Sequence, residues 1–452
     1  MQARRHQQLA RLALMLLVTG VTAGASAQSP RDGVIPIFTF HGPVTSSSEA
    51  EQAEVLLHVL LKTKRKPDGA FIVRTVSYAE TYELQEGRRF APIPDQLTIA
   101  LEHSDDEDNW SPTYLQMLGM LQGEGPFVHE INIPAQHATQ EMRLRVLDWA
   151  IYYIVDLSAV ADDNPHGPAS AASGAFTNAV VIGDMRTKNA TTGAQVLATH
   201  MAHHFSLGFD LYMLYVRGSD LGRAVEANPI TAKYVEQGKL KIVSLDALRV
   251  PLYDKAQSAY DPIKLIAYNH AALSLWGDRA RLAVLDSDEM WSAKEAASTI
   301  DTWFETCFPG CDVLSVGRVE VVCDDCIKNG MSELEYFGQH WDAAEPTEIL
   351  RNFTKVISFH KDPKSIFDAD KVGQVWLHVP FPLAESKVVN VQVNEARFDS
   401  LQDCVFVVHF PNLFGQRIDN TFTSVDRHHW VANRHRKNTG LFGNMLELTT
   451  SV

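Results

Sequence analysis

Three acidic residues, Asp286, Asp288 and Glu289, lie within four positions directly after the apolar run Leu282–Leu285. That run has the composition of a buried strand, so the acids are expected at the edge of a sheet. Carboxylates this close raise one another's pKa unless a cation neutralises them. On an extended backbone, Asp286 and Asp288 would point the same way. Two such oxygen ligands suit Mn²⁺ or Mg²⁺, with the other positions left to water and substrate phosphates.

The residues before this acidic cluster alternate short apolar runs with helical segments. We expect strands at 179–184, Leu211–Val216, Leu240–Leu245 and Arg281–Asp286, and helices near Thr192–Leu207, Asp220–Gln237 and Pro262–Trp276. This alternation predicts an α/β fold with βαβ units and a Rossmann-like, mostly parallel sheet covered on both faces. Ligands of such sheets bind beyond the carboxyl ends of the strands, which places Asp184, Arg217 and Asp286 on one rim. From about Phe308 the pattern changes to strands and loops.

A D-x-D tripeptide alone is weak evidence for a metal site, because most occurrences are solvated turns. Its position after the fourth strand of a βα series makes a functional metal site the favoured interpretation.

Residues 31–175 lack this alternation and are predicted to form a β-rich amino-terminal module, followed by a catalytic domain at 176–452. Within the module, helices are expected at Glu49–Lys62 and Glu141–Val155. The small, breaker-rich stretch Asn164–Gly174 marks its boundary. The basic run Lys62–Lys66 is predicted to be a solvated turn.

Residues 1–27 have the features of a secretory signal: no acidic residue, early arginines, the apolar stretch Leu12–Val21 and the exit Ala25-Ser26-Ala27. Cleavage after Ala27 would place the chain in the lumen of the secretory pathway, including the Golgi, or outside the cell. The alternative is an uncleaved anchor, and only then would a membrane be a partner. The sequons at Asn109, Asn189 and Asn352 would be usable in that compartment.

The composition of the 452 residues, 45% apolar and 21% charged, is typical of a globular protein of two or three domains. A net charge of −15 argues against general nucleic-acid binding, which needs a basic face. Four of the five cysteines lie close together, at Cys307, Cys311, Cys323 and Cys326, and Cys404 stands apart. Their spacing could form a four-thiolate zinc site, but an oxidising lumen favours disulfides, whose pairing the sequence leaves open.

Residues 179–410 resemble glycosyltransferase family 92, which has the GT-A fold. The segment Arg279–Met290 resembles that family's strand ending in D-x-D-E-F. The other similar blocks, in chain order, are Lys188-Asn189, His204 through Leu207-Gly208-Phe209 to Tyr215, Asn269-His270, Lys355-Val356-Ile357 with Pro363 and His378, and His409-Phe410.

The resemblance implies inverting transfer of a hexose, often galactose, from a nucleotide-diphosphate sugar, often that of uridine, to a glycan acceptor. Asp286 and Asp288 would hold Mn²⁺ or Mg²⁺, and a carboxyl-terminal histidine would complete the metal site, with His378 the first candidate and His409 the second. The donor-side residues would be Asp184, Lys188, Asn269 and Asp286. Inversion needs a general base, for which Glu333, Glu335 and Asp342 are the candidates.

Three other interpretations use the same residues. A non-catalytic protein that binds a nucleotide sugar or glycan on this fold is the alternative function, and a metal-dependent hydrolase is a second rival. The pattern His200-x-x-His203-His204 resembles a metalloprotease helix, but Met201 stands where the base would be. Hydrogen-bonded helix histidines are therefore favoured.

Overall fold

The computed structural model describes most of residues 35–155 and 176–413, together with residues 436–437. The longer stretches outside the description are 46–51, 83–97, 107–108, 118–126, 136–141, 147–151, 246–259, 294–297, 377–379 and 394–403. The predicted signal and the Asn164–Gly174 boundary therefore lie outside the described residues, as do Asp184, Lys188 and His378. None of the described helices is long and apolar enough to cross a membrane.

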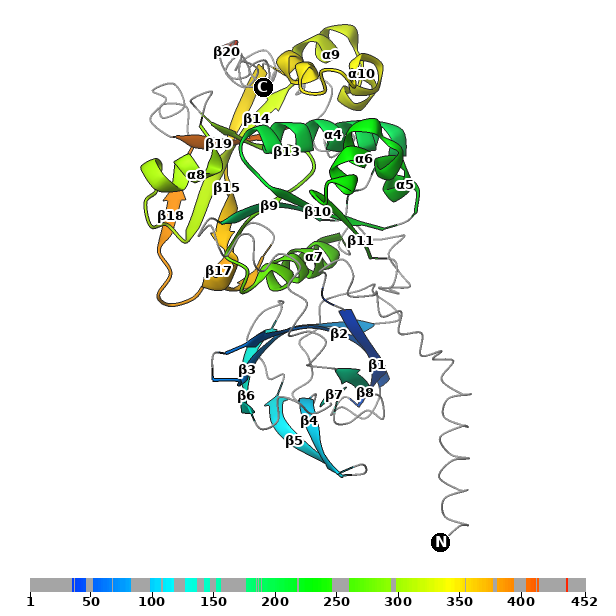
Figure 1. Ribbon diagram of the computed structural model, residues 1–452. Coiled ribbons are helices and arrows are strands. Elements are labelled where there is room, and N and C mark those ends of the chain that lie inside the picture. Colours follow the sequence, from blue (N-terminus) through cyan, green and yellow to red (C-terminus); the bar gives the residue numbers. More distant parts are fainter. Residues whose placement is uncertain are drawn as a thin grey trace.

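The amino-terminal region contains two four-stranded antiparallel sheets (Figure 1). One has the order β1-β2-β3-β6, with β1 Ile37–Thr45, β2 Gln52–Arg65, β3 Phe71–Tyr82 and β6 Phe127–Ile133. The other has the order β5-β4-β7-β8, with β5 Asn109–Met117, β4 Thr98–Asp106, β7 Met142–Val146 and β8 Tyr152–Val155. The region is β-rich, as expected.

Both helices predicted in this region are wrong. Gln52–Arg65 is a strand, and the second segment contains strands β7 and β8. In β2, the dense apolar run hides a two-residue period. Leu60 belongs to the hydrophobic core that includes the helix Tyr260–Leu275, whereas its neighbours Val59 and Leu61 do not belong to that core. A continuous apolar run fits a helix or a strand buried on both faces equally well.

The second region is built on a ten-stranded mixed sheet whose main path is β11-β10-β9-β12-β15-β14-β19-β13. Its first four strands are parallel: β9 Thr177–Ile182, β10 Leu211–Val216, β11 Leu240–Ser244 and β12 Ala280–Leu285. The remaining strands are β13 Glu289–Ala293, β14 Val313–Val322, β15 Lys355–Asp368, β18 Val388–Val391, β19 Val405–His409 and β20 Arg436–Lys437. Strand β15 runs antiparallel to both β12 and β14, so the parallel character is only partial.

Helices cover both faces of the parallel half. Helices α4 (Ala190–Ser206), α5 (Ser219–Ala227) and α6 (Pro229–Glu236) lie on one face, and α7 (Tyr260–Leu275) lies on the other (Figure 1). Alternate residues of β9 pack into the two hydrophobic cores, one on each face of the sheet. Val180 packs on the α4 side and Val181 packs on the α7 side. The predicted single helix at 220–237 is two helices, because Asn228 caps a new helix whose first residue is Pro229.

Helix α7 also carries the contacts with the amino-terminal sheet. The Lys62 ammonium donates to the carbonyls of Ser274 and Trp276 at the helix's carboxyl end, and it pairs with Asp278 at 3.2 Å. The Arg74 guanidinium lies over the Trp276 ring. The prediction of a solvated turn at Lys62–Lys66 is thus wrong, because residues up to Arg65 continue strand β2 and Lys62 binds the α7 end.

The rest of the second region holds short elements between the strands. These are a helical turn at Ile300–Thr302 (α8), a π-helical turn at Trp303–Cys307, α9 (Asp324–Asn329), α10 (Glu333–His340), short 3-10 turns at Glu348–Asn352 and Ala369–Lys371, and the hairpin of β16 (Val372–Val375) and β17 (Pro380–Pro382). Disulfides join Cys307 to Cys404 and Cys323 to Cys326. Cys311 is a buried free thiol, so the four-thiolate zinc site does not form.

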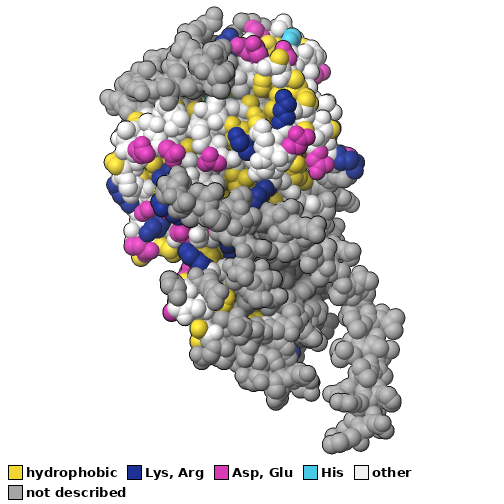
Figure 2. Space-filling view, in the orientation of Figure 1, with side chains coloured by type: hydrophobic (Ala, Val, Ile, Leu, Met, Phe, Trp, Pro, Cys, Tyr) yellow, Lys and Arg dark blue, Asp and Glu magenta, His cyan; other side chains and the backbone are white. Residues whose placement is uncertain are grey.

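Surface charge on the visible face is mixed. Figure 2 shows acidic and basic side chains interspersed over the described upper part of the molecule.

Candidate functional site

The order of the parallel strands makes a topological switch point beside the acidic cluster. The chain goes from β9 outward to β10 and β11, then returns through α7 to place β12 on the opposite side of β9. At their carboxyl ends, the chain therefore leaves β9 toward β10 and leaves β12 toward the other side of the sheet. Open α/β sheets bind their ligands at such a switch point. Gly183 follows β9 there, and Asp286 follows β12.

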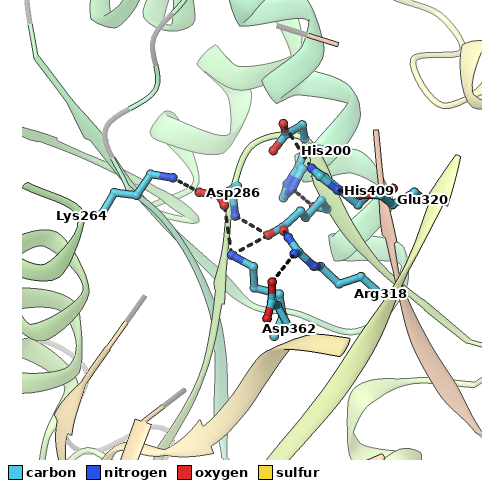
Figure 3. A network of polar contacts seen from close by, with 10 residues as sticks. His200, Lys264, Asp286, Arg318, Glu320, Asp362 and His409 are labelled. Atoms are coloured by element: carbon cyan, nitrogen blue, oxygen red, sulfur yellow. Dashed lines mark hydrogen bonds and ion pairs between the residues drawn. The ribbon is translucent and has the colours of Figure 1, made fainter. Parts of the chain in front are cut away.

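The Asp286 carboxylate is held between two lysines. Lys364 of β15 lies 3.0 Å from one oxygen, and Lys264 of α7 binds the other. Burial raises the pKa of Asp286, but Lys364 and Lys264 outweigh it and hold that pKa well below its usual range. Figure 3 shows Lys264 approaching Asp286 from the left while Arg318 and His409 lie to its right.

The backbone from Asp286 to Asp288 is a turn rather than the extended strand assumed from the sequence, and the Glu289 N–H donates to the Asp286 carbonyl. The two-residue rule for strand side chains therefore does not apply to Asp286 and Asp288.

Glu289 is the structural member of the cluster. Its side chain is completely buried, bonded to Arg318 at 2.5 Å and to Lys364 at 2.9 Å, and it accepts the Asp286 N–H. Burial raises the pKa of Glu289, but Lys364 and Arg318 bring it below its ordinary value. With its oxygens used this way, Glu289 fixes the turn that presents the two aspartates.

Asp288 faces His409. Strands β13 and β19 pair so that Glu289 is opposite His409, and the Phe410 N–H donates to the Asp288 carbonyl. The Nε2 of His409 then lies 3.7 Å from the Asp288 carboxylate, and its Nδ1 lies 3.4 Å from Glu320. Burial lowers the pKa of His409, but the Asp288 and Glu320 carboxylates raise it to about 9.

Glu333 is a buried carboxylate at the first position of α10. Its Oε1 accepts the Cys323 N–H at 3.0 Å, and its Oε2 is buried without a hydrogen-bond partner. Burial raises the pKa of Glu333 to about 7, with Asp288 close enough to contribute to the rise and His409 opposing it.

The other two base candidates are placed differently. Glu335 forms a capping box with Ser332, in which each side chain bonds to the other residue's backbone. Asp342 is exposed and accepts the N–H of Ala344 in a turn. Both carboxylates serve local backbone structure.

Asn269, expected on the donor side, is fully buried and bonded to backbone instead. Its amide donates to the carbonyls of Leu265 and Val375 and accepts the Val375 N–H. These bonds tie β16 to α7 and leave the side chain no group to offer a ligand.

The three α4 histidines bind the backbone of β13. His200 bonds to the Glu289 carbonyl, His203 bonds to the Trp291 carbonyl, and His204 accepts the Trp291 N–H. The prediction of hydrogen-bonded helix histidines is confirmed.

The distance between Asp288 and His409 allows both side chains to bind one divalent cation. Two atoms that each lie about 2.1 Å from one ion can be up to about 4.2 Å apart, which includes the observed 3.7 Å. A hard oxygen and an imidazole nitrogen are both suitable ligands for Mn²⁺. No group of three or more His, Cys, Asp or Glu side chains arranged for a metal is found among the described residues, so a ligand would have to supply the other positions. Asp286 fits less well, because two ammonium groups already occupy its oxygens.

Sequence reasoning missed the cations of this site, Lys264, Lys364 and Arg318, and the acid Glu320. Lys264 carried a usable signal: a lysine among apolar residues in a helix that precedes the acidic strand. Glu320 lies opposite His409 in the β14–β19 pair, which could be found only once that pairing was known.

No protein-family model matches the chain, and a comparison with curated proteins gave no match. Among solved structures, the chain is similar to glucosyl-3-phosphoglycerate synthase from Mycobacterium tuberculosis, determined in complex with Mg²⁺ and uridine diphosphate. The identity is 11% and the TM-score 0.22, over 52% of this chain and 78% of that one. A TM-score this low does not establish a common fold, and the site rests on its own contacts.

Proposed function

We propose that this protein is a metal-dependent glycosyltransferase of the family 92 type, on a GT-A fold. It transfers a hexose, galactose being one candidate, from a nucleoside-diphosphate sugar to a glycan acceptor with inversion. We place it in the secretory lumen or outside the cell, which the two disulfides support.

The observation that carries this proposal is the Asp288–His409 pair at the switch point of the parallel strands. The two residues are 121 positions apart and meet because β19 pairs with β13. An acid and an imidazole facing each other at a ligand-binding rim suit one divalent cation. When bound, that cation would neutralise the charge that develops on the leaving diphosphate.

Asp288 and His409 are therefore assigned to the metal, whereas Asp286 is assigned to the donor side. The two lysines fix the Asp286 carboxylate at the switch point, where it would accept a hydrogen bond from a donor hydroxyl. Glu289 and Arg318 support the turn from beneath and do not take part in the chemistry.

Glu333 is assigned as the general base. Its Oε1 is anchored by the Cys323 N–H, while Oε2 has no protein partner and can accept the proton of the acceptor hydroxyl. As that proton reaches Oε2, the acceptor oxygen forms a bond to the anomeric carbon. The bond from that carbon to the phosphate oxygen breaks, and its electron pair leaves with the nucleoside diphosphate.

Release of nucleoside diphosphate from a panel of nucleotide sugars, with Mn²⁺ and a panel of glycan acceptors, tests the proposal. We expect turnover that EDTA abolishes, and a loss of about 100-fold or more in Asp288→Ala and His409→Ala. Asp220→Ala, at an exposed acid of α5, should keep full activity. An Asp288→Ala protein as active as wild type would contradict the metal assignment.

The same assay separates the rival functions. Donor binding without turnover on any acceptor would favour the non-catalytic binding protein. Release of free sugar that outpaces transfer to every acceptor would favour a hydrolase.

A further inference from the structure

Lys264 lies at the switch point between β9 and β12. It extends from α7 across the end of β9, where a Cβ built on Gly183 would lie 3.0 Å from the Lys264 Cγ and 3.1 Å from the Tyr268 ring. Any side chain at position 183 would crowd Lys264 and Tyr268 along this path. The lysine's end reaches Asp286, so its ammonium sits at the edge where a ligand of this sheet would bind (Figure 3).

The two lysines on Asp286 are not equivalent. Lys364 is almost completely buried and lies 3.0 Å from Asp286 and 2.9 Å from Glu289, so two carboxylates match its charge. Lys264 comes from the opposite element, α7, and pairs with the other oxygen of Asp286. If Lys264 moved by a few ångströms, Asp286 would still be paired with Lys364.

Because Lys364 also pairs with Asp286, Lys264 can leave Asp286 for another partner at a small cost in free energy. A buried carboxylate that loses its only cation is strongly destabilised, but Asp286 would retain one. The Lys264 and Asp286 side chains are largely buried, and an ammonium held away from bulk water binds phosphate oxygens more strongly than one in bulk water.

We infer that Lys264 binds the diphosphate of the donor, leaving Asp286 to Lys364 as the donor binds at the switch point. The inference rests on the proposed function and adds a second cation to the site, one that belongs to the protein. Lys264 would stabilise negative charge on the leaving diphosphate together with the metal held by Asp288 and His409.

Calorimetric titration of the full chain with UDP, GDP, ADP and CDP, in Mn²⁺ and separately in EDTA, provides the test. The tightest ligand is then compared with its parent nucleoside, which has no phosphates, and with inorganic pyrophosphate. The variants are Lys264→Met, Lys264→Arg and Gly183→Ala, the last of which obstructs the lysine's path without removing its charge. Lys62→Met is the matched control, since Lys62 binds the other end of the same helix.

Lys264→Met should bind the nucleoside diphosphate and pyrophosphate about 10- to 100-fold more weakly, in both Mn²⁺ and EDTA, with nucleoside affinity unchanged. Lys264→Arg should recover part of that loss, and Gly183→Ala should weaken binding in the same direction by a smaller factor. Lys62→Met should bind like wild type. Thermal melting shows whether each variant is folded. If Lys264→Met is unfolded, the affinities of Lys264→Arg and Gly183→Ala test the inference.

Two results would overturn the inference and leave the proposed function standing. One is a folded Lys264→Met protein that binds the diphosphate as well as wild type does. The other is an equal loss for the nucleoside and the diphosphate, which would make Lys264 merely structural. If wild type itself binds none of the four nucleoside diphosphates, the proposed function fails and the inference falls with it.

Discussion

Neighbouring acids in this chain have different surroundings and therefore different chemistry. Asp286 is neutralised by two lysines, Asp288 faces an imidazole, and Glu289 is buried against Arg318 and Lys364. The sequence marks all three as one acidic cluster. Which of them can accept a cation depends on side chains contributed by α7, β15 and β19.

At the same scale, Glu333 predicts the pH dependence of the reaction. Its pKa is raised to about 7, and it must be deprotonated to act as a base. With Mn²⁺ saturating, so that His409 stays deprotonated, the value of kcat/KM should therefore fall about tenfold per pH unit below pH 7 and level off above it. Steady-state rates from pH 5 to 8.5 measure this, and Glu333→Gln should lose activity throughout.

Glu335→Gln is the control for that experiment, because Glu335 caps the same helix. The Glu335→Gln variant should show the same decrease in kcat/KM below about pH 7 as wild type. An unchanged acid limb in an active Glu333→Gln enzyme would remove Glu333 from the role of base.

The elements that form the site are held by polar contacts between helix and strand. The α4 histidines bond to β13, and Tyr212 of β10 bonds to His200 and His204. His204 accepts the Trp291 N–H at its Nε2, which requires that ring to be neutral. Burial lowers the pKa of His200 and His203 to about 4 and the pKa of His204 well below its usual value.

These histidines predict acid destabilisation of the fold. Between about pH 6.5 and pH 4 the unfolded chain binds protons that the folded chain excludes, so the free energy of unfolding falls as the pH falls. Each histidine with a folded pKa of about 4 contributes up to about 3 kcal/mol over that interval. Urea denaturation from pH 4.5 to 7.5 measures the slope.

His270 of α7 offers a single-site check of that slope. Its pKa is also lowered to about 4 by burial, and it bonds to Tyr215 and to the Ile35 carbonyl. His270→Gln, which cannot titrate, should reduce proton uptake on unfolding by up to one. An equally steep slope in this variant would contradict the prediction.

Elements with a clear helical or strand period could be predicted from the sequence, and the others could not. Helices α4 and α7 and strands β10 and β12 lie within two residues of their expected bounds. Strand β2 was mistaken for a helix because its apolar residues form a nearly continuous run. The break between α5 and α6 was visible as Asn228-Pro229, a cap followed by a first-turn proline.

At the scale of the whole molecule, the Cys307–Cys404 disulfide helps bring the end of the chain back to the site. It spans 97 residues and ends one position before β19, the strand that carries His409. Closing so long a loop restricts the unfolded chain strongly, so a Cys307→Ser, Cys404→Ser double variant should lose about 2 to 4 kcal/mol of stability. Denaturant unfolding measures the loss.

The second disulfide is the comparison for that measurement. Cys323 and Cys326 are separated by only three positions, so their loop restricts the unfolded chain far less. Equal losses from the two double variants would argue against a loop-length effect.

The parallel half of the sheet could be predicted because strands and helices alternate along the sequence. The mixed half could not, since β13, β14, β15 and β19 pair out of chain order. The Asp288–His409 pair depends on that order, which is why His409 was only the second candidate from sequence. Lys364 was missed for the same reason, because its proximity to Asp286 is purely tertiary.

Strand β13 lies at the end of the sheet's main path, a position that ordinarily invites another strand to add. Its backbone at Glu289 and Trp291 is bonded to imidazoles of α4. A helix thus occupies the place of the next strand. Because the backbone groups of Glu289 and Trp291 are already bonded, they cannot pair with a strand of a second molecule. This edge of the sheet is therefore protected from self-association.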